Sequence, residues 1–356
     1  MRILWVGKSG SGDSGAGDEV YDRKLLQRLE LSHDIIRFVP EPLSRPSKLL
    51  NLALGVPLYR ATYRSHANIM RLRTLIRETN PNVVAISWEP FDFFAAVIDK
   101  PVVLLLHNIT SDAILEVFYR NFVAKWYARK LSRYEEMLYN RANISSVVVL
   151  SVRDADVARG LVKCKPVIVV SPGAPPVSGR PDNQVRPELI ISGTYDWYPK
   201  RRDLVEASEE FRSAVNFPLS LFWDKPLPKK ARTALEGIYL RDVPQELALR
   251  FGFVPDKFSS GFKLKVTYYI VNNCIVLSKS DVSQDYEGIA DFELFIRRVN
   301  NVAEIEEIYK EISRMDPIQL INRFEVFKQA CVKRFSWDEG AERVSALLES
   351  AAMQRS

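Results

Sequence analysis

The sequence predicts a two-domain α/β protein in which each domain is built around a doubly wound parallel sheet. Three observations support this. The chain has 356 residues, which suggests two domains at roughly 100–200 residues per domain. Short runs rich in Val and Ile recur along it, with helical patterns between them. A stretch rich in proline and glycine divides this alternation into two halves.

The first half contains nearly continuous apolar runs, which are typical of parallel strands buried on both faces. These expected strands are Ile3–Val6, Ile35–Val39, Val83–Ser87, Val102–Leu106, Val147–Leu150 and Val167–Val170. Helix signals fall at Asp18–Leu31 and in the long Asp112–Ala142 region. Strand–helix alternation of this kind indicates βαβ units.

The stretch from Ser171 to Pro181 has four prolines and two glycines, and polar residues follow it to Pro187. We therefore expect a domain at 1–174, a stiff linker at 175–187, a second domain at 188–335 and a final helix at 336–356. The strands expected after the linker are Leu189–Ser192, Pro218–Phe222, Ile238–Leu240, Phe251–Val254 and Ile275–Ser278. The helices expected there are Arg202–Arg212, Pro228–Glu236 and Lys263–Val271, and the last sixty residues read as entirely helical, as in Val302–Arg314 and Trp337–Ala352.

Composition excludes several classes of protein. With 47% hydrophobic and 26% charged residues, the chain is not a disordered one. Its three cysteines are far apart and its three histidines do not cluster near them, so neither a disulfide framework nor a metal site is expected. We expect the protein to lie in a reducing compartment. The N-terminus reads as a first strand and not as a signal peptide, and no apolar run approaches the ~20 residues of a spanning helix. We expect a cytoplasmic protein, either soluble or peripheral on the inner face of the cell membrane.

A glycine-rich loop follows the first strand, and Gly10, Gly12 and Gly15 spell GxGxxG. Glycines between a strand and a helix let the backbone approach an anionic ligand. A dinucleotide site also needs an acidic residue at the end of the second strand, and Glu41 comes late and offset. The loop is thus either a structural turn or, as we favour, a loop that faces substrate through Gly12, Gly15 and Gly17.

His107 follows the expected strand Val102–Leu106 directly. An imidazole at the carboxyl end of a buried strand stands where the ligands of such sheets bind. A structural histidine held by hydrogen bonds in a loop is the alternative, and both interpretations stay open.

The region 116–141 interleaves cations with aromatic residues. One interpretation is a core-packed helix with a solvated basic face. The other is contact with an anionic membrane, because basic side chains are attracted to the leaflet and aromatic rings suit the headgroup region. The residues in question are Arg120, Lys125, Arg129, Lys130, Arg133 and Arg141 with Phe118, Tyr119, Phe122, Trp126, Tyr127 and Tyr134.

Cations also begin two helices of the second domain. Lys200, Arg201 and Arg202 follow a strand and the Gly193 segment, and Lys263 and Lys265 follow a second small-residue segment. Cations at a helix N-terminus oppose the macrodipole, and an anionic ligand relieves that conflict. Solvated basic helix ends are the alternative, but two such sites in one domain favour a phosphate-bearing ligand.

Together these segments resemble the GT-B glycosyltransferases, and are most similar to the retaining group called glycosyltransferase family 4. The resemblance covers nearly the whole chain and rests on the order and spacing of its motifs. The segments that carry it are the glycine loop, His107, Arg133-Tyr134-Glu135, Gly193 through Pro199, Gly261 through Val266, Ile275 through Ser278, Glu287-Gly288-Ile289 and Phe335-Ser336-Trp337.

The resemblance implies two Rossmann-like domains that face a cleft, with the last helix crossing back toward the N-terminal domain. It implies a retaining, metal-independent hexosyltransferase that needs no cofactor, in which the C-terminal domain binds a nucleoside-diphosphate sugar (UDP or GDP) and the N-terminal domain binds a glycan or lipid-linked acceptor. Polysaccharide or cell-surface glycan biosynthesis is the implied setting. The residues implied for catalysis are His107, Lys200 and Lys263. Those implied for donor binding are Gly193, Thr194, Arg201, Gly261, Phe262, Lys265, Glu287 and Gly288.

The chain departs from the family pattern at three positions. Ser260 and Tyr268 stand where the family often carries two glutamates, and Thr194 stands where an arginine is frequent. Either the chain is a divergent branch in which Lys200, Arg201, Lys263 and Lys265 share the work, or its activity is lost or altered. Two alternatives to sugar transfer are a GT-B epimerase that acts on the nucleotide sugar itself and a non-catalytic family member acting as a partner subunit, to which the missing glutamates point. Nucleic-acid binding rests only on the net charge of +6 and is not expected.

Overall fold

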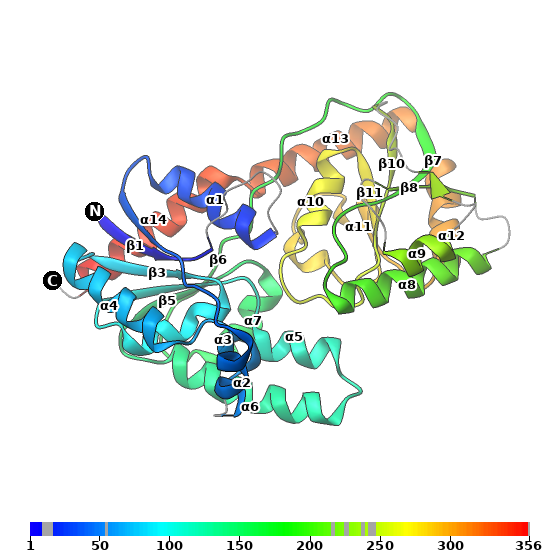
Figure 1. The fold of residues 1–356 in the computed structure, drawn as a ribbon. Helices are drawn as coiled ribbons and strands as arrows, with labels where there is room; N and C mark the ends of the chain where they lie inside the picture. Colours follow the sequence, from blue (N-terminus) through cyan, green and yellow to red (C-terminus); the bar gives the residue numbers. More distant parts are fainter. Residues whose placement is uncertain are drawn as a thin grey trace. The chain divides into compact units, whose positions relative to one another are not determined.

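A computed structural model of the chain describes residues 1–8, 17–53, 56–214, 218–223, 228–235, 239–240 and 247–354. The chain forms two compact units (Figure 1). Unit 1 comprises Met1–Pro172, Ser260–Phe262 and Trp337–Ser356, and unit 2 comprises Gly173–Ser259 and Lys263–Ser336.

Unit 1 is built on a six-stranded parallel sheet in the order β2-β1-β3-β4-β5-β6. The strands are β1 (Arg2–Val6), β2 (Asp34–Phe38), β3 (Val83–Ser87), β4 (Val102–Leu106), β5 (Ile144–Val149) and β6 (Val167–Val169). The order reverses between β1 and β3, which makes the sheet doubly wound and puts its switch point between these two strands.

Both faces of this sheet are buried, which explains the continuous apolar runs. Along β4, Val102, Leu104 and Leu106 pack on one face, while Val103 and Leu105 pack on the other. This follows from the two-residue period of a strand, which sends alternate side chains to opposite faces.

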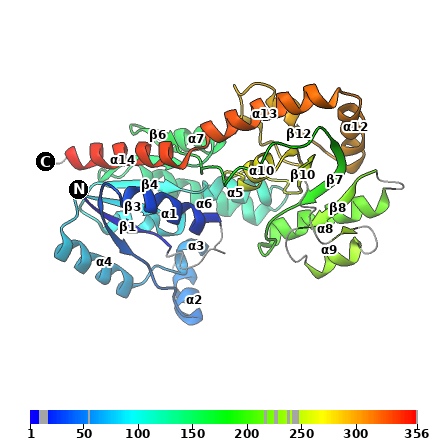
Figure 2. The same ribbon diagram turned by 90° about the horizontal axis from the view of Figure 1, so that it is seen from above.

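Helices cover the two faces of this sheet (Figure 2). The helix α14 (Trp337–Met353) packs beside α1 (Gly17–Leu29) on the face formed by Val103 and Leu105. The other helical elements are α2 (Arg45–Ala53), α3 (Leu58–Ala61), α4 (His66–Thr79), η1 (Glu89–Val97), α5 (Thr110–Val117), α6 (Phe122–Tyr139) and α7 (Val152–Leu161). Ser65, Asn121 and Ser151 cap α4, α6 and α7, because each side chain accepts a hydrogen bond from a backbone N–H in the first turn.

Unit 2 is built on a second six-stranded parallel sheet, in the order β12-β11-β10-β7-β8-β9. The strands are β7 (Val185–Ile191), β8 (Ser220–Trp223), β9 (Tyr239–Leu240), β10 (Leu249–Val254), β11 (Cys274–Ser278) and β12 (Ile296–Arg298). The switch point lies between β7 and β10. The helical elements are α8 (Tyr198–Ser213), α9 (Lys229–Ala234), α10 (Leu264–Val271), η2 (Ser283–Asp285), α11 (Phe292–Phe295), α12 (Val302–Ser313) and α13 (Pro317–Arg334).

The predicted fold class of two doubly wound parallel sheets is confirmed, with local corrections. The 112–142 region is two helices, because the Asn121 side chain accepts a hydrogen bond from the Ala124 N–H and caps a new helix there. The last sixty residues are not entirely helical, since β12 ends at Arg298. β7 begins at Val185, inside the expected linker, and its pairing with β10 shifts register around Pro187. Proline lacks an N–H and is tolerated in a sheet at such irregularities.

Candidate active site

Two polar clusters lie at the switch points of the two sheets, one in each unit. In unit 1, Gly7 follows β1 and Ser87 ends β3. In unit 2, Gly193 comes two residues after β7, and Asp256 comes two residues after β10. Ligands of open α/β sheets bind outside the carboxyl ends of the strands at this point, so both clusters stand where a ligand is expected.

The strand-end cluster of unit 1 consists of Asp22, Ser87, Glu89 and His107. The ring of His107 is buried, and its Nε2 lies 3.3 Å from Ser87 Oγ and 4.0 Å from Asp22 Oδ1. The Ser87 hydroxyl donates a hydrogen bond to the Asp22 carboxylate. A Cβ on Gly7 would lie 2.6 Å from Asp22 Oδ2, so the absent side chain is what admits this carboxyl.

Burial controls the charge states of this cluster. It is the main reason that the pKa of His107 falls to about 4, a fall that the negative charge of Asp18 opposes and the positive charge of Lys8 assists. It raises the pKa of Asp22 to about 7, although the hydrogen bonds from Ser87 and the Lys8 N–H oppose the rise. At neutral pH the imidazole is therefore uncharged, and its ring nitrogens act by hydrogen bonding and not as a cation.

Glu89 joins the cluster from the first turn of η1. Its Oε1 accepts a hydrogen bond of 3.1 Å from Asn108 Nδ2, and burial raises its pKa to about 8. The preceding residue, Trp88, has a φ of 87°, a conformation that side-chain-bearing residues rarely adopt. The Lys8 Nζ atom lies 3.6 Å from the centroid of the Trp88 ring. Backbone strain of this kind costs of order 1–3 kcal/mol and clusters at ligand sites.

Two residues predicted to bind the donor, Gly261 and Phe262, belong to unit 1. Gly261 has a φ of 73°, its N–H donates to Asp154 Oδ1 at 3.4 Å, and a Cβ there would lie 3.4 Å from the carbonyl oxygen of His107. Phe262 packs against the face of the sheet that α1 and α14 cover. This glycine therefore lies beside the strand-end histidine.

The lysine cluster of unit 2 consists of Lys200, Lys263 and Lys265 around Asp256. Lys200 lies in the first turn of α8, and the other two lysines lie at the start of α10. The Lys265 Nζ atom lies 3.4 Å from Asp256 Oδ1 and 3.2 Å from the Tyr195 hydroxyl. The three predicted lysines are thus brought together by a carboxylate that the sequence did not reveal.

The pKa of Asp256 reflects the positive charges of these three lysines. Its side chain is fully buried, and burial by itself raises the pKa of a carboxyl. Lys265, Lys200 and Lys263 nevertheless bring the pKa of Asp256 below its ordinary value. The cluster therefore contains three cations and one anion, and the N-termini of two helices add partial positive charge.

Gly193 gives Lys265 its path to this cluster. The glycine has a φ of 105°, and a Cβ on it would lie 3.0 Å from Lys265 Cε. Lys263 is held differently, with its Nζ 4.1 Å from the centroid of the Phe258 ring, which in turn meets Trp197 edge to face. The two aromatic rings and the glycine therefore shape the surroundings of the lysines.

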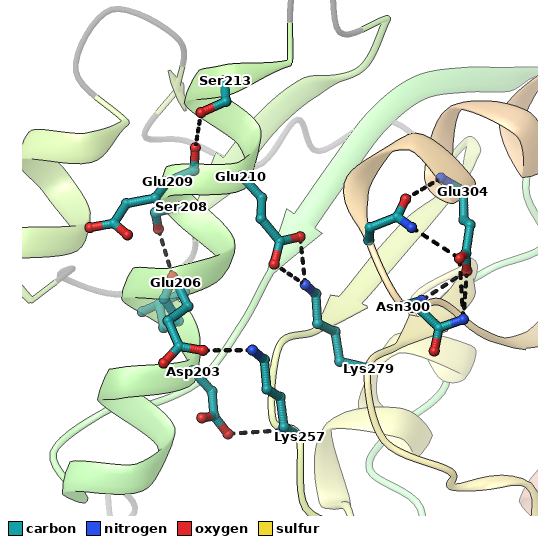
Figure 3. A network of polar contacts seen from close by, with 12 residues as sticks. Asp203, Glu206, Ser208, Glu209, Glu210, Ser213, Lys257, Lys279, Asn300 and Glu304 are labelled. Carbon is teal, nitrogen blue, oxygen red and sulfur yellow. Dashed lines mark hydrogen bonds and ion pairs between the residues drawn. The ribbon is translucent and has the colours of Figure 1, made fainter.

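Ion pairs hold α8 against the ends of the strands that carry the cluster (Figure 3). Lys257, next to Asp256, donates its N–H to Asp203 at 2.9 Å and pairs through Nζ with Glu206 at 2.6 Å. Lys279, which follows β11, pairs with Glu210. These contacts tie three successive turns of α8 to the sheet edge and so fix the start of the helix, where Lys200 lies.

The other predicted residues lie apart from these contacts. Thr194 is exposed, and Arg201 is exposed in the first turn of α8. Arg202 pairs with Asp203 and Glu206.

Glu287 and Gly288 belong to the loop after η2. Glu287 lines an open pocket whose charged residues also include Asp281, Glu293, Arg297 and Arg298. Gly288 has a φ of 84° with open space around it. Of the acceptor-side glycines, Gly17 begins α1, and Gly12 and Gly15 lie outside the described residues.

Sequence reasoning missed Asp22, Ser87, Glu89 and Asp256. Three of them carried a usable signal. Ser87 ends a strand and Glu89 follows it, as His107 follows the next strand. Asp256 also follows a strand, β10. Asp22 lies within a helix and gave no such signal.

Among the described residues, no group of three His, Cys, Asp or Glu side chains is placed to hold a metal ion. Within the same part of the chain, no helix has the length and apolar character needed to cross a membrane.

Comparison with models of protein families gives no match, and comparison with curated protein sequences gives no significant one. Solved structures do match. Sucrose-phosphate synthase from Thermosynechococcus elongatus aligns over 98% of both chains with 14% identity and a TM-score of 0.65. A trehalose-6-phosphate structure from E. coli bound with UDP-2-fluoro glucose aligns over 98% of this chain and 99% of that one, with 12% identity and a TM-score of 0.59. MnaA of S. aureus in complex with UDP aligns over 97% and 94%, with 12% identity and a TM-score of 0.50. The chain therefore has the GT-B glycosyltransferase fold, as the resemblance in its sequence predicted.

Proposed function

We propose that this protein is a glycosyltransferase that moves a sugar from a nucleoside-diphosphate sugar to a glycan or lipid-linked acceptor. The observation that carries the proposal is the lysine cluster around Asp256 in a unit of the GT-B fold. The lysines outnumber the carboxylate, and several cations in one place complement the charge of a diphosphate. Two helix N-termini at the switch point of the sheet favour the same ligand.

The roles of the donor-side residues follow from charge. When the bond between sugar and diphosphate breaks, negative charge builds up on the departing nucleotide. Lys200 and Lys263 stabilise this charge, and Lys265 holds the diphosphate beside Gly193. From the family resemblance alone, we also assign Thr194, Arg201, Gly261 and Phe262 to donor binding and Glu287 and Gly288 to the ribose or the donor sugar. The same resemblance is the basis for proposing a retaining, metal-independent hexosyl transfer with no cofactor.

The strand-end cluster of unit 1 supplies the polar contacts for the reacting sugar or the acceptor. The neutral ring of His107 can exchange a hydrogen bond with a sugar hydroxyl, while Ser87 and Asp22 orient it. Keeping a neutral group there leaves the cationic charge to the lysine cluster. We also assign the glycine loop that carries Gly12, Gly15 and Gly17 to acceptor binding, on the basis of the family resemblance.

The exposed basic and aromatic surface of the 116–141 region supports an acceptor at the inner face of the cell membrane. Polysaccharide or cell-surface glycan biosynthesis in the cytoplasm is the corresponding setting. Nucleic acid has no part in this function.

A thermal-shift screen tests the donor. We expect one of UDP, GDP, ADP or TDP to raise the melting temperature of the full chain. Lys263→Ala should abolish that shift and leave the unliganded melting temperature close to the wild-type value, since the lysine lies at the start of α10. Lys310→Ala, in an exposed pair on α12, is the matched control and should keep the shift. No shift with any of the four nucleotides would contradict the proposal.

Product analysis separates transfer from its alternatives. Incubation with the donor alone should leave it intact or slowly hydrolysed, and adding acceptor should release the nucleotide. An epimerised donor would indicate the epimerase instead. Donor binding with no turnover in any acceptor mixture would indicate a non-catalytic partner subunit.

A further inference from the structure

The hairpin of α5 and α6 exposes a group of apolar side chains at its tip. Phe122 and Val123 are 81% and 68% exposed, and Tyr119 and Trp126 are more than half exposed. The opposite side of the hairpin is buried by packing of Ile114, Ala128 and Leu131. The exposed side chains are therefore different from the ones that the hairpin uses for its own packing.

A second element continues this surface. The short helix α3 lies beside α6, because the Leu58 N–H donates a hydrogen bond of 2.8 Å to the Tyr127 hydroxyl, and α2 packs against α3 (Figures 1 and 2). Leu49, Leu50 and Leu58 are 65%, 61% and 46% exposed, and Tyr59 is also exposed. We call the whole set the docking surface: Leu49, Leu50, Leu58, Tyr59, Tyr119, Phe122, Val123 and Trp126.

The sequence segments that carry the docking surface contain cations and no acidic residue. Residues 117–134 hold five cations and no Asp or Glu, and residues 42–77 likewise hold no acidic residue. Lys130 lies over the Trp126 ring at 3.9 Å, and Arg120 lies over the Tyr119 ring at 5.2 Å. The cations thus stand at the aromatic side chains themselves, the mixed character that anionic lipid headgroups favour.

A buried ion pair anchors these elements. Arg60 of α3 donates a hydrogen bond through Nε to Asp92 Oδ1 at 2.6 Å. Its Nη2 lies 3.8 Å from Glu135 Oε1 of α6. All three side chains are at most 1% exposed. One guanidinium thus joins α3 and α6, two of the helices that carry the docking surface, to η1.

We propose that the docking surface binds the anionic leaflet of a lipid membrane, with its apolar side chains in the headgroup region and its cations on the lipid phosphates. A second copy of this chain would bring the same positive charge and be repelled, whereas an anionic leaflet complements it. The proposal does not depend on the donor or on sugar transfer, since vesicle binding is measured without either.

Vesicle co-sedimentation of the full chain tests the proposal. We expect binding to phosphatidylcholine vesicles that contain about a third phosphatidylglycerol, and weak binding to phosphatidylcholine alone. Binding should fall in 1 M salt, where charges are screened beyond about 3 Å. Lys125→Gln with Lys130→Gln should weaken binding by about fivefold per cation removed.

Apolar variants separate the two elements. Phe122→Ser with Trp126→Ser should weaken binding by about tenfold or more, because buried apolar area is lost. Leu49→Ser with Leu50→Ser should weaken it as well and tests α2 by itself. The matched control is Leu31→Ser, since Leu31 is 86% exposed and lies in the turn after α1, outside the docking surface.

Fluorescence locates the contact. Brominated lipid should quench tryptophan emission of the wild-type chain, and Trp126→Phe should remove that quenching. Equal binding to neutral and anionic vesicles would overturn the proposal, and so would an equal loss in Leu31→Ser. A dimer that Phe122→Ser with Trp126→Ser abolishes would also overturn it, because a second copy would then be the occupant.

Discussion

The Nζ atom of Lys265 lies 3.4 Å from Oδ1 of Asp256, a carboxylate that is fully buried and also faces Lys200 and Lys263. The negative charge of Asp256 attracts all three lysines and limits the repulsion among them, and a diphosphate would bring further negative charge to the same place.

Replacing Asp256 with a neutral residue should therefore increase the stabilisation that the nucleotide provides. In Asp256→Asn the lysines lose the attraction of this buried carboxylate, so we expect the unliganded chain to lose about 1–3 kcal/mol of unfolding free energy. The thermal shift caused by the nucleoside diphosphate should grow, because the ligand then replaces the negative charge that Asp256 supplied. Lys265→Met should lower the unliganded stability too but shrink the shift. Thermal melts with and without the nucleotide distinguish the two variants, and shrinkage in both would contradict this account.

Asp22 and His107 should impose opposite pH dependences on stability. Folding raises the pKa of Asp22 from 3.8 to about 7, so its proton is held by the folded chain and lost by the unfolded one, and stability falls as pH rises between these values. Folding lowers the pKa of His107 from 6.5 to about 4, so stability rises with pH over that window.

Asp22→Asn removes only the first of these effects. The unfolding free energy of the variant minus that of the wild type should increase between about pH 4 and 7, by up to about 1.4 kcal/mol per pH unit. Urea denaturation at several pH values measures this difference. Ser87→Ala is the control, because it keeps the carboxyl and only removes a hydrogen bond that lowers its pKa. If the difference in unfolding free energy between Asp22→Asn and the wild type did not change with pH, Asp22 would be ionised at neutral pH in the folded chain.

The fold was predictable from sequence because it rests on local patterns. Buried strands such as β3 and β4 are short apolar runs, and their ends agree with the prediction to the residue. β12 was missed because only three residues form it, at the edge of the sheet. The helices between β2 and β3 were missed as well, since they present few buried side chains and thus little periodicity, as in α2, which buries none.

The candidate site was predictable only where a strand end marked it. His107 and the lysines stand next to strand or helix ends, which a sequence displays. Asp22 meets Ser87 across 65 positions, and such a contact depends on how helices pack on the sheet. The same holds for Asp256, because its role depends on three lysines at the starts of α8 and α10.

The buried contact of Arg60 with Asp92 and Glu135 should be costly to break. Arg60→Met leaves two buried carboxyls without their cation, and we expect a loss of about 3–5 kcal/mol near pH 8. The loss should be smaller near pH 5, because burial already raises the pKa of Glu135 to about 7 and a protonated carboxyl needs no cation. Arg64→Met, at an exposed arginine in the turn after α3, should change stability by less than about 0.5 kcal/mol. Equal losses at pH 5 and pH 8 would contradict this explanation.

His107 should affect the transferred sugar and not the nucleotide. The ring lies with Ser87 and Asp22 in unit 1, whereas the lysine cluster belongs to unit 2. His107→Ala should therefore keep the thermal shift produced by the nucleoside diphosphate. The transfer rate should fall about 10- to 100-fold, which corresponds to one or two lost hydrogen bonds to the reacting groups. His107→Gln, which keeps a hydrogen-bonding group, should recover part of that rate, because the native imidazole is neutral at pH 7. If His107→Ala lost the nucleotide shift, or if His107→Gln were no better than alanine, the ring would have a structural role and no contact with the sugar.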